Sequence, residues 1–444
     1  MSSPLDTTLL YYDAIVIGGG IVGSGIFRDL SINGVNTLLV EKKDFSSQTS
    51  SKSSKMLHGG IRYLENMDFD LVWEALHEKN LWIKIAPHLC YESKFILPIY
   101  LDSIRPKWMI KIGLFIYDLL SSFQNTHHQM YNKDQVIKNL PQIKQEGLKG
   151  GGVYSDAIVD DARLGIELIH DGVAKNNSSK AINYISVKDF IFKGDIVEVR
   201  LKDELTDTEK TIRCKELILA TGPFTDDILS KHKQLTWTNK LLPSKGSHIW
   251  LKSNSLDVKM PTVLTPKDGR VIFVIPQKDN ILVGTTEIEH TGDKFDITPS
   301  QEEIDYLLTN VREYFPNSAV GKEDIITSFS ALRPLVKEDA TNTKSKTARN
   351  HKYYQPRHNL HVIIGGKYTT FRVMAKEITQ VVCSKLNKPY NSSLSRRPLD
   401  RMRKIEVFKK NIYDQDELTK IKEAEYIRKE EDLPKRLGLI YKNL

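Results

Sequence analysis

The sequence predicts an α/β protein in which a Rossmann-like nucleotide-binding domain is combined with a second domain built on a mixed, largely antiparallel sheet. Three observations lead to this fold class. A glycine-rich turn joins an apolar strand to a helix near the N-terminus, another apolar strand ends in Ala-Thr-Gly at 220–222, and a hairpin pattern lies between residues 271 and 286. With 444 residues the chain exceeds one hydrophobic core, so two or three domains are expected.

The apolar run at 14–17 leads into glycines with the spacing G-x-G-x-x-G, at Gly18, Gly20 and Gly23. The run is typical of a strand that is buried on both faces. Gly18 permits the tight turn, Gly20 lets the backbone approach a pyrophosphate, and Gly23 lets the next helix pack closely. The phosphates are then expected at the N-terminus of that helix.

The helix is expected to end at Asn33-Gly34, and a second apolar strand at 37–40 ends in Glu41, 23 residues after Gly18. An acidic residue at about this spacing binds the ribose hydroxyls of a dinucleotide. Strand, turn, helix and acid together therefore predict a dinucleotide site, whereas a glycine-rich turn without a ligand is the alternative.

The composition, with 40% hydrophobic and 27% charged residues, is that of a soluble globular protein. Three widely spaced cysteines, Cys90, Cys214 and Cys383, indicate structural thiols in a reducing compartment and no metal-ligand cluster. The N-terminal residues resemble neither a signal peptide nor a transit segment, which predicts a cytoplasmic protein. Because the lysines are spread along the chain, the net charge of +8 does not indicate nucleic-acid binding.

A serine-rich segment at 46–55 runs into Met56-Leu57-His58-Gly59-Gly60-Ile61-Arg62-Tyr63-Leu64-Glu65. Its hydroxyls and amides suit phosphate oxygens, and a flexible linker is the alternative. The segment resembles the phosphate-and-flavin loop of the FAD-dependent, quinone-linked glycerol-3-phosphate dehydrogenases, within the D-amino-acid-oxidase-like flavoproteins. The resemblance extends over residues 11–392 and implies FAD, held by a two-dinucleotide-binding domain.

Two amphipathic or apolar helices are expected after this loop. Apolar positions recur at helical spacing over 70–85, and residues 105–120 are apolar except for Lys111, Asp118 and the basic residues at their start. The second segment is too short to cross a bilayer. It is either a buried core helix or an interfacial helix that places Trp108, Phe115 and Ile116 in the acyl boundary, with Arg105 and Lys107 at anionic headgroups.

The middle of the chain is expected to return to the nucleotide sheet. Glycines and lysines at 145–152 indicate a boundary, and residues 154–164 are predicted to open a helix capped by Asp160-Asp161. Strand patterns follow at 182–187, 196–201, 211–212 and 216–219. By analogy with two-dinucleotide-binding flavoproteins, the last strand passes its Thr-Gly turn near the cofactor, so the FAD domain is discontinuous.

The second domain carries the hairpin, with strands at 271–276 and 281–286, and a helix that begins at Ser300. A strand at 361–364 then meets Gly365-Gly366 and another helix start, whose positive end would face the flavin pyrimidine. The expected domains are FAD-binding (1–93, 150–232 and 345–392), substrate or cap (94–149 and 233–344, with the membrane-facing helix) and C-terminal helical (393–444).

Alcohol oxidation by a flavin requires a base for the hydroxyl proton and anchors for the rest of the substrate. Lys245-Gly246-Ser247-His248 matches a motif of the family, and histidines titrate near neutral pH, so His248 is the expected base. Arg62 and Arg333 are the expected phosphate anchors because guanidinium groups bind phosphate bidentately. A histidine hydrogen-bonded in the sheet and arginines at the surface are the alternatives.

Further site residues are expected from their side-chain chemistry and from the resemblance. Tyr63 and Arg349 join the substrate site, and Lys367 is assigned both to catalysis and to the flavin edge. The expected FAD contacts are Gly18, Gly20, Gly23, Glu41, Thr49, Ser50, Ser54, His58, Gly59, Gly60, Val187, Thr221, Gly222, Gly365, Gly366, Lys367 and Thr369. As an alternative, His58 is a covalent attachment point for the flavin.

The resemblance thus implies oxidation of sn-glycerol 3-phosphate to dihydroxyacetone phosphate, with electrons passed to membrane quinone at the cytoplasmic face of the inner membrane. A homodimer is a candidate assembly, and no metal is expected. The alternatives are an oxidase that uses oxygen, a non-catalytic flavin-binding protein and a nicotinamide-linked dehydrogenase. Two departures from the family are a shorter C-terminal region and Phe224 in place of the usual Trp.

Overall fold

The computed structural model describes residues 2–277, 279–337, 351–399 and 425–432. Its contacts divide the described residues into two compact units, which we call the nucleotide unit (2–51, 160–243, 333–337, 351–399 and 425–432) and the cap unit (52–159, 244–277 and 279–332). The nucleotide unit contains the predicted cradle, and the cap unit contains the predicted base.

The nucleotide unit is built on an eight-stranded sheet with the central order β17-β18-β10-β1-β2-β7. The strands from β18 to β7 run parallel, and the antiparallel strands β8 and β9 extend from β10. The bounds are β1 Tyr11–Ile17, β2 Thr37–Glu41, β7 Lys180–Asn183, β8 Ile185–Lys193, β9 Ile196–Asp203, β10 Glu209–Leu219, β17 His351–Arg357 and β18 Leu360–Gly365. The prediction that the Ala-Thr-Gly strand returns to the nucleotide sheet is confirmed, since β10 pairs directly with β1.

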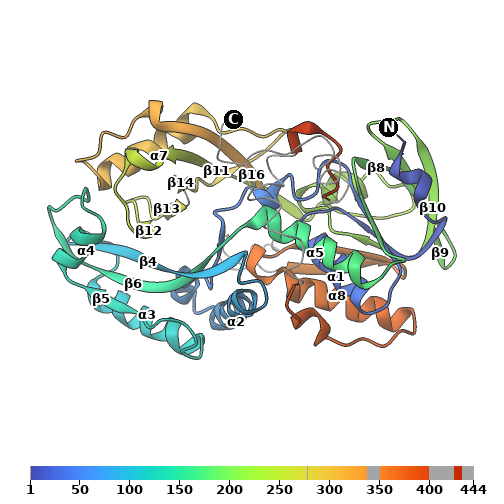
Figure 1. Ribbon diagram of the computed structural model, residues 1–444, viewed down its shortest axis with the longest axis horizontal. Coiled ribbons are helices and arrows are strands. Elements are labelled where there is room, and N and C mark those ends of the chain that lie inside the picture. Colours follow the sequence, from blue (N-terminus) through green and yellow to red (C-terminus); the bar gives the residue numbers. More distant parts are fainter. Residues whose placement is uncertain (1, 278, 338–350, 400–424, 433–444) are drawn as a thin grey trace, which may run out of the picture. The chain divides into compact units, whose positions relative to one another are not determined.

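Both faces of the β1–β2–β10 centre are buried. Ala14 and Val16 face a core shared with α1 (Ile21–Ile32), α5 (Asp161–Lys175) and α8 (Phe371–Lys385), and α1 packs between the other two helices (Figure 1). Ile15 and Ile17 face the opposite core, which β8 and β9 cover. The alternation of strand side chains therefore explains the continuous apolar run. The short α6 (Thr225–Leu229) follows β10.

The cap unit is built on a ten-stranded sheet with the path β15-β11-β14-β13-β12-β4-β6-β3, joined by β16 beside β11 and β5 beside β6. The pairs in this sheet for which a register is resolved are antiparallel except β4 with β12. The bounds are β3 Met56–Leu57, β4 Cys90–Tyr100, β5 Gln129–Tyr131, β6 Leu148–Val159, β11 Leu241–Lys252, β12 Thr262–Leu264, β13 Ile272–Gln277, β14 Asn280–Gly284, β15 Ile288–Glu289 and β16 Ile325–Val336. The predicted hairpin is confirmed as β13 and β14.

Four helices accompany this sheet: α2 Phe69–Ile85, α3 Lys107–Leu120, α4 Lys133–Asn139 and α7 Gln301–Tyr314. The predicted helices at 70–85, 105–120 and from Ser300 are therefore confirmed. The Ser300 hydroxyl accepts from the Glu303 amide and the Glu303 carboxylate accepts from the Ser300 amide, which is a complete capping box.

The helical assignment of 154–159 is wrong, because these residues belong to the long strand β6, which also includes 148–152 of the segment where a boundary is expected. The glycines have a packing role there. A Cβ on Gly152 would lie 2.8 Å from Ile110 and Leu114 of α3, and one on Gly151 would lie 3.1 Å from the Leu97 carbonyl. The helix begins at Asp161, with Asp160 as its N-cap, so only the capping part of the prediction is confirmed.

Two predicted strand boundaries also differ. The segment 182–187 is divided between β7 and β8 at Tyr184, which has φ +57°, and the patterns at 211–212 and 216–219 are parts of one strand, β10. The contact-based units differ from the expected domains mainly at 52–93, which lies in the cap unit because β3 and β4 pair with β6. The three cysteines are buried, and none of them forms a disulfide within the described part of the chain.

The expected C-terminal helical region lies mostly outside the described residues. Within the described part, residues 425–432 contact the nucleotide unit. Glu425 accepts from Arg163 at 2.7 Å, and Arg428 binds Asp203 at 2.8 Å. These ion pairs fasten the segment to α5 and β9.

Candidate functional site

The glycine cradle has the close approaches that its spacing predicts. Gly18 has φ +106°, and a Cβ there would lie 2.5 Å from the Ala220 carbonyl oxygen at the end of β10. A Cβ on Gly23 would lie 1.8 Å from the Gly18 carbonyl oxygen. Gly20 is the N-cap of α1 and offers no side-chain cap. The Ile21 amide donates to Ser50, so an anion at this helix start would be bound by the amides that follow it in the first turn.

Glu41 lies at the end of β2 beside this turn. Its carboxylate accepts hydrogen bonds from the Gly19 amide at 2.7 Å and the Lys43 amide at 2.9 Å. Burial raises the pKa of Glu41, although these amide hydrogen bonds oppose the shift. The carboxylate is therefore held at the cradle in a fixed orientation.

The serine-rich loop closes on the same turn. Ser50 Oγ accepts from the Ile21 amide at 2.8 Å, and the Ser46 amide donates to the Gly19 carbonyl at 2.9 Å. Ser46 and Ser47 have buried hydroxyl oxygens that make no hydrogen bond within the described part of the chain. Buried hydroxyls of this kind normally have partners, so the loop fits a bound group with polar atoms such as a dinucleotide.

The carboxyl ends of four parallel strands meet at one edge of the nucleotide sheet, and the predicted cofactor residues lie there. Gly18–Gly20 follow β1, Glu41 ends β2, Thr221 and Gly222 follow β10, and Gly365 to Lys367 follow β18. Ligands of open α/β sheets bind outside this edge. The residues after β18 turn sharply, since Gly365 and Gly366 have φ +76° and +81°, and Thr369 is buried in the short helix before α8.

Other predicted cofactor residues lie elsewhere. Val187, in β8, packs against the core on the face that β8 and β9 cover. Thr49 begins a short 3₁₀ helix, Thr49–Ser51, in the serine-rich loop. Ser54, His58, Gly59 and Gly60 belong to the cap unit.

In the cap unit, the imidazole of His248 is enclosed on both faces. His248 lies opposite Gly284 across the β11–β14 pair, and a Cβ on Gly284 would lie 2.1 Å from His248 Cδ2. Phe329 of β16 stacks on the ring, with centroids 4.9 Å apart and planes at 14°. The edge carrying Nε2 faces Ser54, whose Oγ is 2.9 Å away.

The motif residues before His248 are tied to Glu303 of α7. Lys245 forms an ion pair with the Glu303 carboxylate at 2.6 Å, and Ser247 Oγ donates to it at 2.7 Å. Thr286 Oγ1 also donates to this carboxylate, at 2.8 Å. Burial would raise the pKa of Glu303, but these partners outweigh it and the pKa is lowered. Glu303 therefore fixes the strand on which His248 lies.

The Gly59-Gly60 loop is supported from beneath by a buried polar cluster, which we call the loop support: Lys79, Tyr117 and Asp156. The Tyr117 hydroxyl accepts from the Gly59 amide at 2.9 Å and donates to Asp156 at 2.7 Å. Lys79 Nζ lies 3.5 Å from Asp156 and has no exposed side-chain surface. Burial raises the pKa of Asp156 and lowers that of Lys79, although each charge stabilises the other.

The predicted substrate residues are distributed over both units. Arg62 and Tyr63 lie in the 3₁₀ helix Ile61–Asn66 of the cap unit, where Arg62 is exposed and Tyr63 is buried with its ring against Gly60. Arg333 lies half-buried in β16, and its contacts assign it to the nucleotide unit. Arg349 lies outside the described residues.

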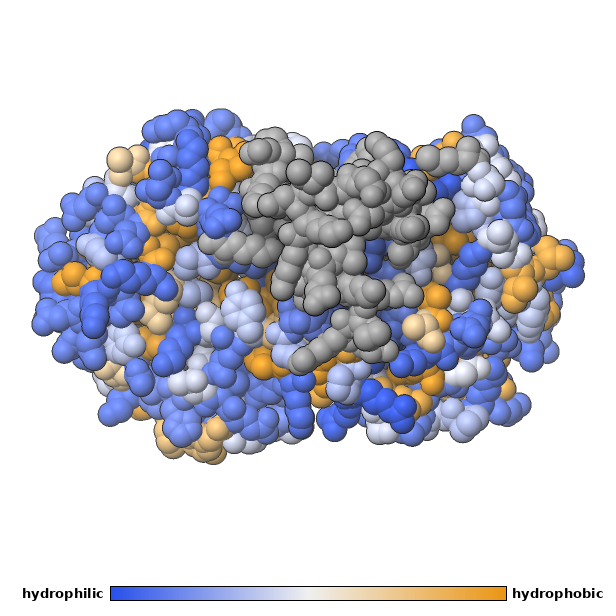
Figure 2. All heavy atoms as spheres, viewed as in Figure 1, coloured by the Kyte–Doolittle hydropathy of each residue, from blue (hydrophilic) through white to orange (hydrophobic). Residues whose placement is uncertain are grey.

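Helix α3 packs one face on the cap unit and leaves the other exposed. Ile110, Leu114 and Tyr117 are buried, whereas the outward residues are Trp108, Met109, Ile112, Phe115 and Leu119. Ile116 is half-buried. Hydrophobic side chains reach the surface at the lower edge of Figure 2, where Figure 1 places α3.

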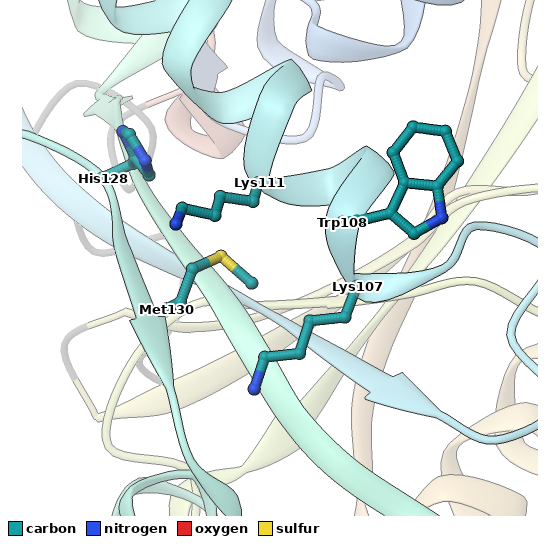
Figure 3. Close-up of a pocket in the computed structure, with 5 residues that line it drawn as sticks. All are labelled: Lys107, Trp108, Lys111, His128 and Met130. Carbon is teal, nitrogen blue, oxygen red and sulfur yellow. The ribbon is translucent and has the colours of Figure 1, made fainter.

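A surface pocket of about 680 Å³ lies against this helix, lined by Lys107, Trp108, Lys111, His128 and Met130. Figure 3 shows Lys111 directed toward His128 and Met130, while Trp108 points to the other side of the helix. His128 Nδ1 lies 2.7 Å from the buried Asp118 carboxylate. Arg105, expected beside Lys107, instead pairs with Glu65 at 2.8 Å. The basic residues of α3 that line the pocket are Lys107 and Lys111.

The described residues contain neither a candidate metal-ligand group nor a candidate membrane-spanning helix. They contain no group of three or more His, Cys, Asp or Glu side chains placed to hold a metal ion. None of the helices among them is long and apolar enough to cross a membrane.

Sequence reasoning missed the partners of several site residues. It assigned Ser54 to the cofactor and did not connect it with His248, which is 194 positions away. It also missed Gly284, Phe329 and the loop support, for which no local pattern exists. The helix start at Ser300 was predicted, but the contact of Glu303 in that helix with the strand of His248 was not.

Comparison with known proteins gives a consistent picture. Residues 13–381 match the family model described as FAD dependent oxidoreductase. The chain is 34% identical over 384 residues to the aerobic glycerol-3-phosphate dehydrogenase of Staphylococcus haemolyticus, covering 85% of this chain and 68% of that protein. The corresponding Staphylococcus aureus USA300 protein is also 34% identical, over 388 residues, covering 86% and 69%.

Solved structures of enzymes with bound FAD are also similar to this chain. The glycerol-3-phosphate dehydrogenase of Bacillus halodurans, complexed with FAD, superimposes with a TM-score of 0.71 at 30% identity, covering 88% of this chain and 68% of that one. The L-α-glycerophosphate oxidase of Mycoplasma pneumoniae has a TM-score of 0.67 at 17% identity, covering 88% and 98%. At that identity the oxidase shows a shared fold.

Proposed function

Because this chain belongs to the family of FAD-dependent glycerol-3-phosphate dehydrogenases, we propose that it oxidises sn-glycerol 3-phosphate to dihydroxyacetone phosphate and passes the electrons to a membrane quinone. FAD is the cofactor of this family and, when bound, supplies the acceptor for the hydride. The observation that carries the proposal is the fixed imidazole of His248, enclosed by Gly284 and Phe329, because alcohol oxidation needs an oriented base.

The cofactor residues follow from the edge of the nucleotide sheet. Gly18, Gly20 and Gly23 would hold the pyrophosphate at the start of α1, and Glu41 would bind the ribose hydroxyls. The glycines allow this because they have no Cβ, which lets the backbone approach the pyrophosphate closely. The turns at 220–222 and 365–367 would line the remainder of the cofactor.

His248 takes the hydroxyl proton of the substrate in this proposal. Arg62 and Arg333 bind its phosphate group, because their guanidinium groups stay charged and can form two hydrogen bonds each. Lys367, which follows the Gly365-Gly366 turn, neutralises negative charge near the site. Arg349 is a further candidate anchor.

The exposed face of α3 is the reason for proposing quinone as the electron acceptor. Quinones reside in the bilayer, and the exposed face of α3 combines apolar side chains with Lys107 and Lys111, which suits an anionic lipid surface. The protein would then bind peripherally at the cytoplasmic face of the inner membrane. A homodimer is a further expectation, which light scattering of the purified protein would test.

The test is anaerobic reduction of the purified holoprotein. Adding glycerol 3-phosphate should bleach the visible flavin band, whereas glycerol, which lacks the phosphate, should act far more slowly. Soluble quinone added without oxygen should then restore the band within turnover time. Rapid reoxidation by oxygen with peroxide formation would instead identify an oxidase, and a flavin that never bleaches would refute the proposed substrate.

The His248→Asn variant tests the base. It should retain its flavin content but lose roughly 10²- to 10⁴-fold in the rate of flavin reduction, the usual contribution of general base catalysis. A variant that reduces at the wild-type rate would remove His248 from this role.

A further inference from the structure

The two ring nitrogens of His248 have different surroundings. The side chain is only 3% exposed, and its Nδ1 is buried. Gly284 and Phe329 cover the two faces of the ring, so the Nε2 edge is the direction in which a hydrogen-bonded neighbour lies. Ser54 Oγ occupies that direction at 2.9 Å.

Because Ser54 occupies the Nε2 edge of His248, it affects how the ring can accept a proton from an alcohol. An imidazole nitrogen has a single in-plane site, which is either a lone pair or an N–H bond. While Ser54 holds this site, a substrate hydroxyl cannot bind Nε2 directly. Ser54 is half-buried, whereas the His248 side chain that it contacts is buried.

We propose that Ser54 is a proton relay between the substrate hydroxyl and His248, an inference that rests on the proposed function. The substrate O–H bond breaks as its proton passes to Ser54 Oγ, and the proton of Ser54 passes to His248 Nε2 in the same event. FAD, when bound, would supply the acceptor for the C–H hydrogen of the same substrate carbon and its electron pair. Dihydroxyacetone phosphate and protonated His248 result, with Ser54 again a neutral hydroxyl.

The chemistry of serine suits this position. A hydroxyl group donates one hydrogen bond and accepts two, so Ser54 can donate to neutral His248 and accept from the protonated ring after a simple rotation. Alanine would remove both functions. Threonine would keep the hydroxyl group with one added methyl group.

The decisive experiment compares Ser54→Ala with wild type by anaerobic stopped-flow flavin reduction at saturating FAD and glycerol 3-phosphate. The relay predicts a fall of roughly 10²-fold or more in the limiting rate with little change in KM. Ser54→Thr should recover most of this rate. Ser53→Ala is the matched control, because Ser53 Oγ accepts from the Lys55 amide, and it should reduce at nearly the wild-type rate.

A proton inventory in mixed H₂O and D₂O gives a second measurement. Two protons move together in the relay, so the wild-type rate should fall along a curve as the deuterium fraction rises, and the residual rate of Ser54→Ala should fall along a straight line. In flavin-free protein, the nitrogen resonance of His248 Nε2 should shift in Ser54→Ala and stay unchanged in Ser53→Ala.

Several outcomes would overturn the relay. One is a Ser54→Ala protein, saturated with FAD, whose flavin is reduced by glycerol 3-phosphate as fast as that of wild type. This result would mean that the substrate binds Nε2 directly and displaces Ser54 in the wild-type enzyme. Another is a linear proton inventory for the wild type. If the wild-type flavin is not reduced by glycerol 3-phosphate at all, the proposed function fails and the relay fails with it.

Discussion

The Tyr117 hydroxyl donates to the Asp156 carboxylate across 2.7 Å and joins α3 to β6 beneath the Gly59-Gly60 loop. The same hydroxyl accepts from the Gly59 amide, and a Cβ on Gly59 would lie 2.6 Å from it. The helix that exposes Trp108 on its outer face therefore holds the predicted flavin loop with its inner face. Removing one member of such a buried cluster takes one buried partner from each group that it contacts.

Tyr117→Phe tests this support. The variant should lose about 1–3 kcal/mol in the free energy of unfolding, since Gly59 and Asp156 lose a buried partner. Hydrogen exchange at the Gly59 amide should accelerate, and the affinity for FAD should fall. Tyr154→Phe, in the same core with its ring 5.7 Å from Tyr117, is the control and should leave the Gly59 exchange rate unchanged. Equal exchange in both variants would show that Tyr117 does not hold the loop.

Gly284→Ala should displace the base. A Cβ at this position would lie 2.1 Å from His248 Cδ2, so the ring or its strand must move. We expect a drop of roughly 10- to 100-fold in the rate of flavin reduction, because small misplacements of a catalytic group are costly. Flavin content should be retained. Gly194→Ala serves as a control in open space, although its φ of +62° adds some strain. An active Gly284→Ala enzyme would show that the position of His248 matters little.

Arg333→Lys should weaken substrate binding. Lysine keeps the charge but loses the paired hydrogen bonds of a guanidinium group, so KM for glycerol 3-phosphate should rise by roughly tenfold or more. The rate at saturating substrate should change less than KM does. Arg270→Lys, at an exposed position, is the comparison and should leave KM unchanged. A variant that instead loses flavin would place Arg333 at the cofactor.

Trp108→Ser tests the proposed lipid contact of α3. Trp108 is 66% exposed, so its replacement should leave thermal stability nearly unchanged. Losing a large aromatic anchor should weaken binding to vesicles that contain anionic lipid by roughly 10-fold or more, measured by co-flotation. Trp73→Ser, at a 51% exposed position of α2, is the matched control. Equal binding by wild type and both variants would refute the contact.

The stability of the nucleotide unit should depend on pH through Asp29. Burial raises its pKa from 3.8 to about 6, against opposing hydrogen bonding by Tyr390 and the charge of Arg28. The folded state therefore holds the proton more tightly than the unfolded state, so this contribution is present below pH 4 and is lost as the pH rises through 6. Two pKa units correspond to about 3 kcal/mol.

Asp29→Asn should remove this dependence. The variant should gain stability relative to wild type as the pH is raised from 4 to 8, measured by chemical denaturation across that range. Asp195→Asn, at a 98% exposed side chain, should follow the wild-type profile. A constant difference between Asp29→Asn and wild type at all pH values would show that Asp29 does not titrate abnormally.

The sequence by itself determined the local elements of the nucleotide unit. Strand β1, the turn at Gly18, helix α1 and Glu41 follow from apolar periodicity, glycine spacing and the rigid geometry of a strand–turn–helix unit. The motif around His248 and the helix cap at Ser300 were equally local. Each is decided by residues only a few positions apart, so a linear pattern contains enough information to predict it.

Only the tertiary structure decided which distant groups meet. Ser54 reaches His248, and Glu303 reaches Lys245, because a sheet brings separate strands and helices together at registers that no spacing records. The glycines at 150–152 show the same limit. Their composition indicates a boundary, yet they lie inside β6, where Gly152 allows close packing of α3 and Gly150 and Gly151 allow close approach of β5 and β4. Burial and partner choice depend on the whole fold, whereas propensity depends on neighbours in the chain.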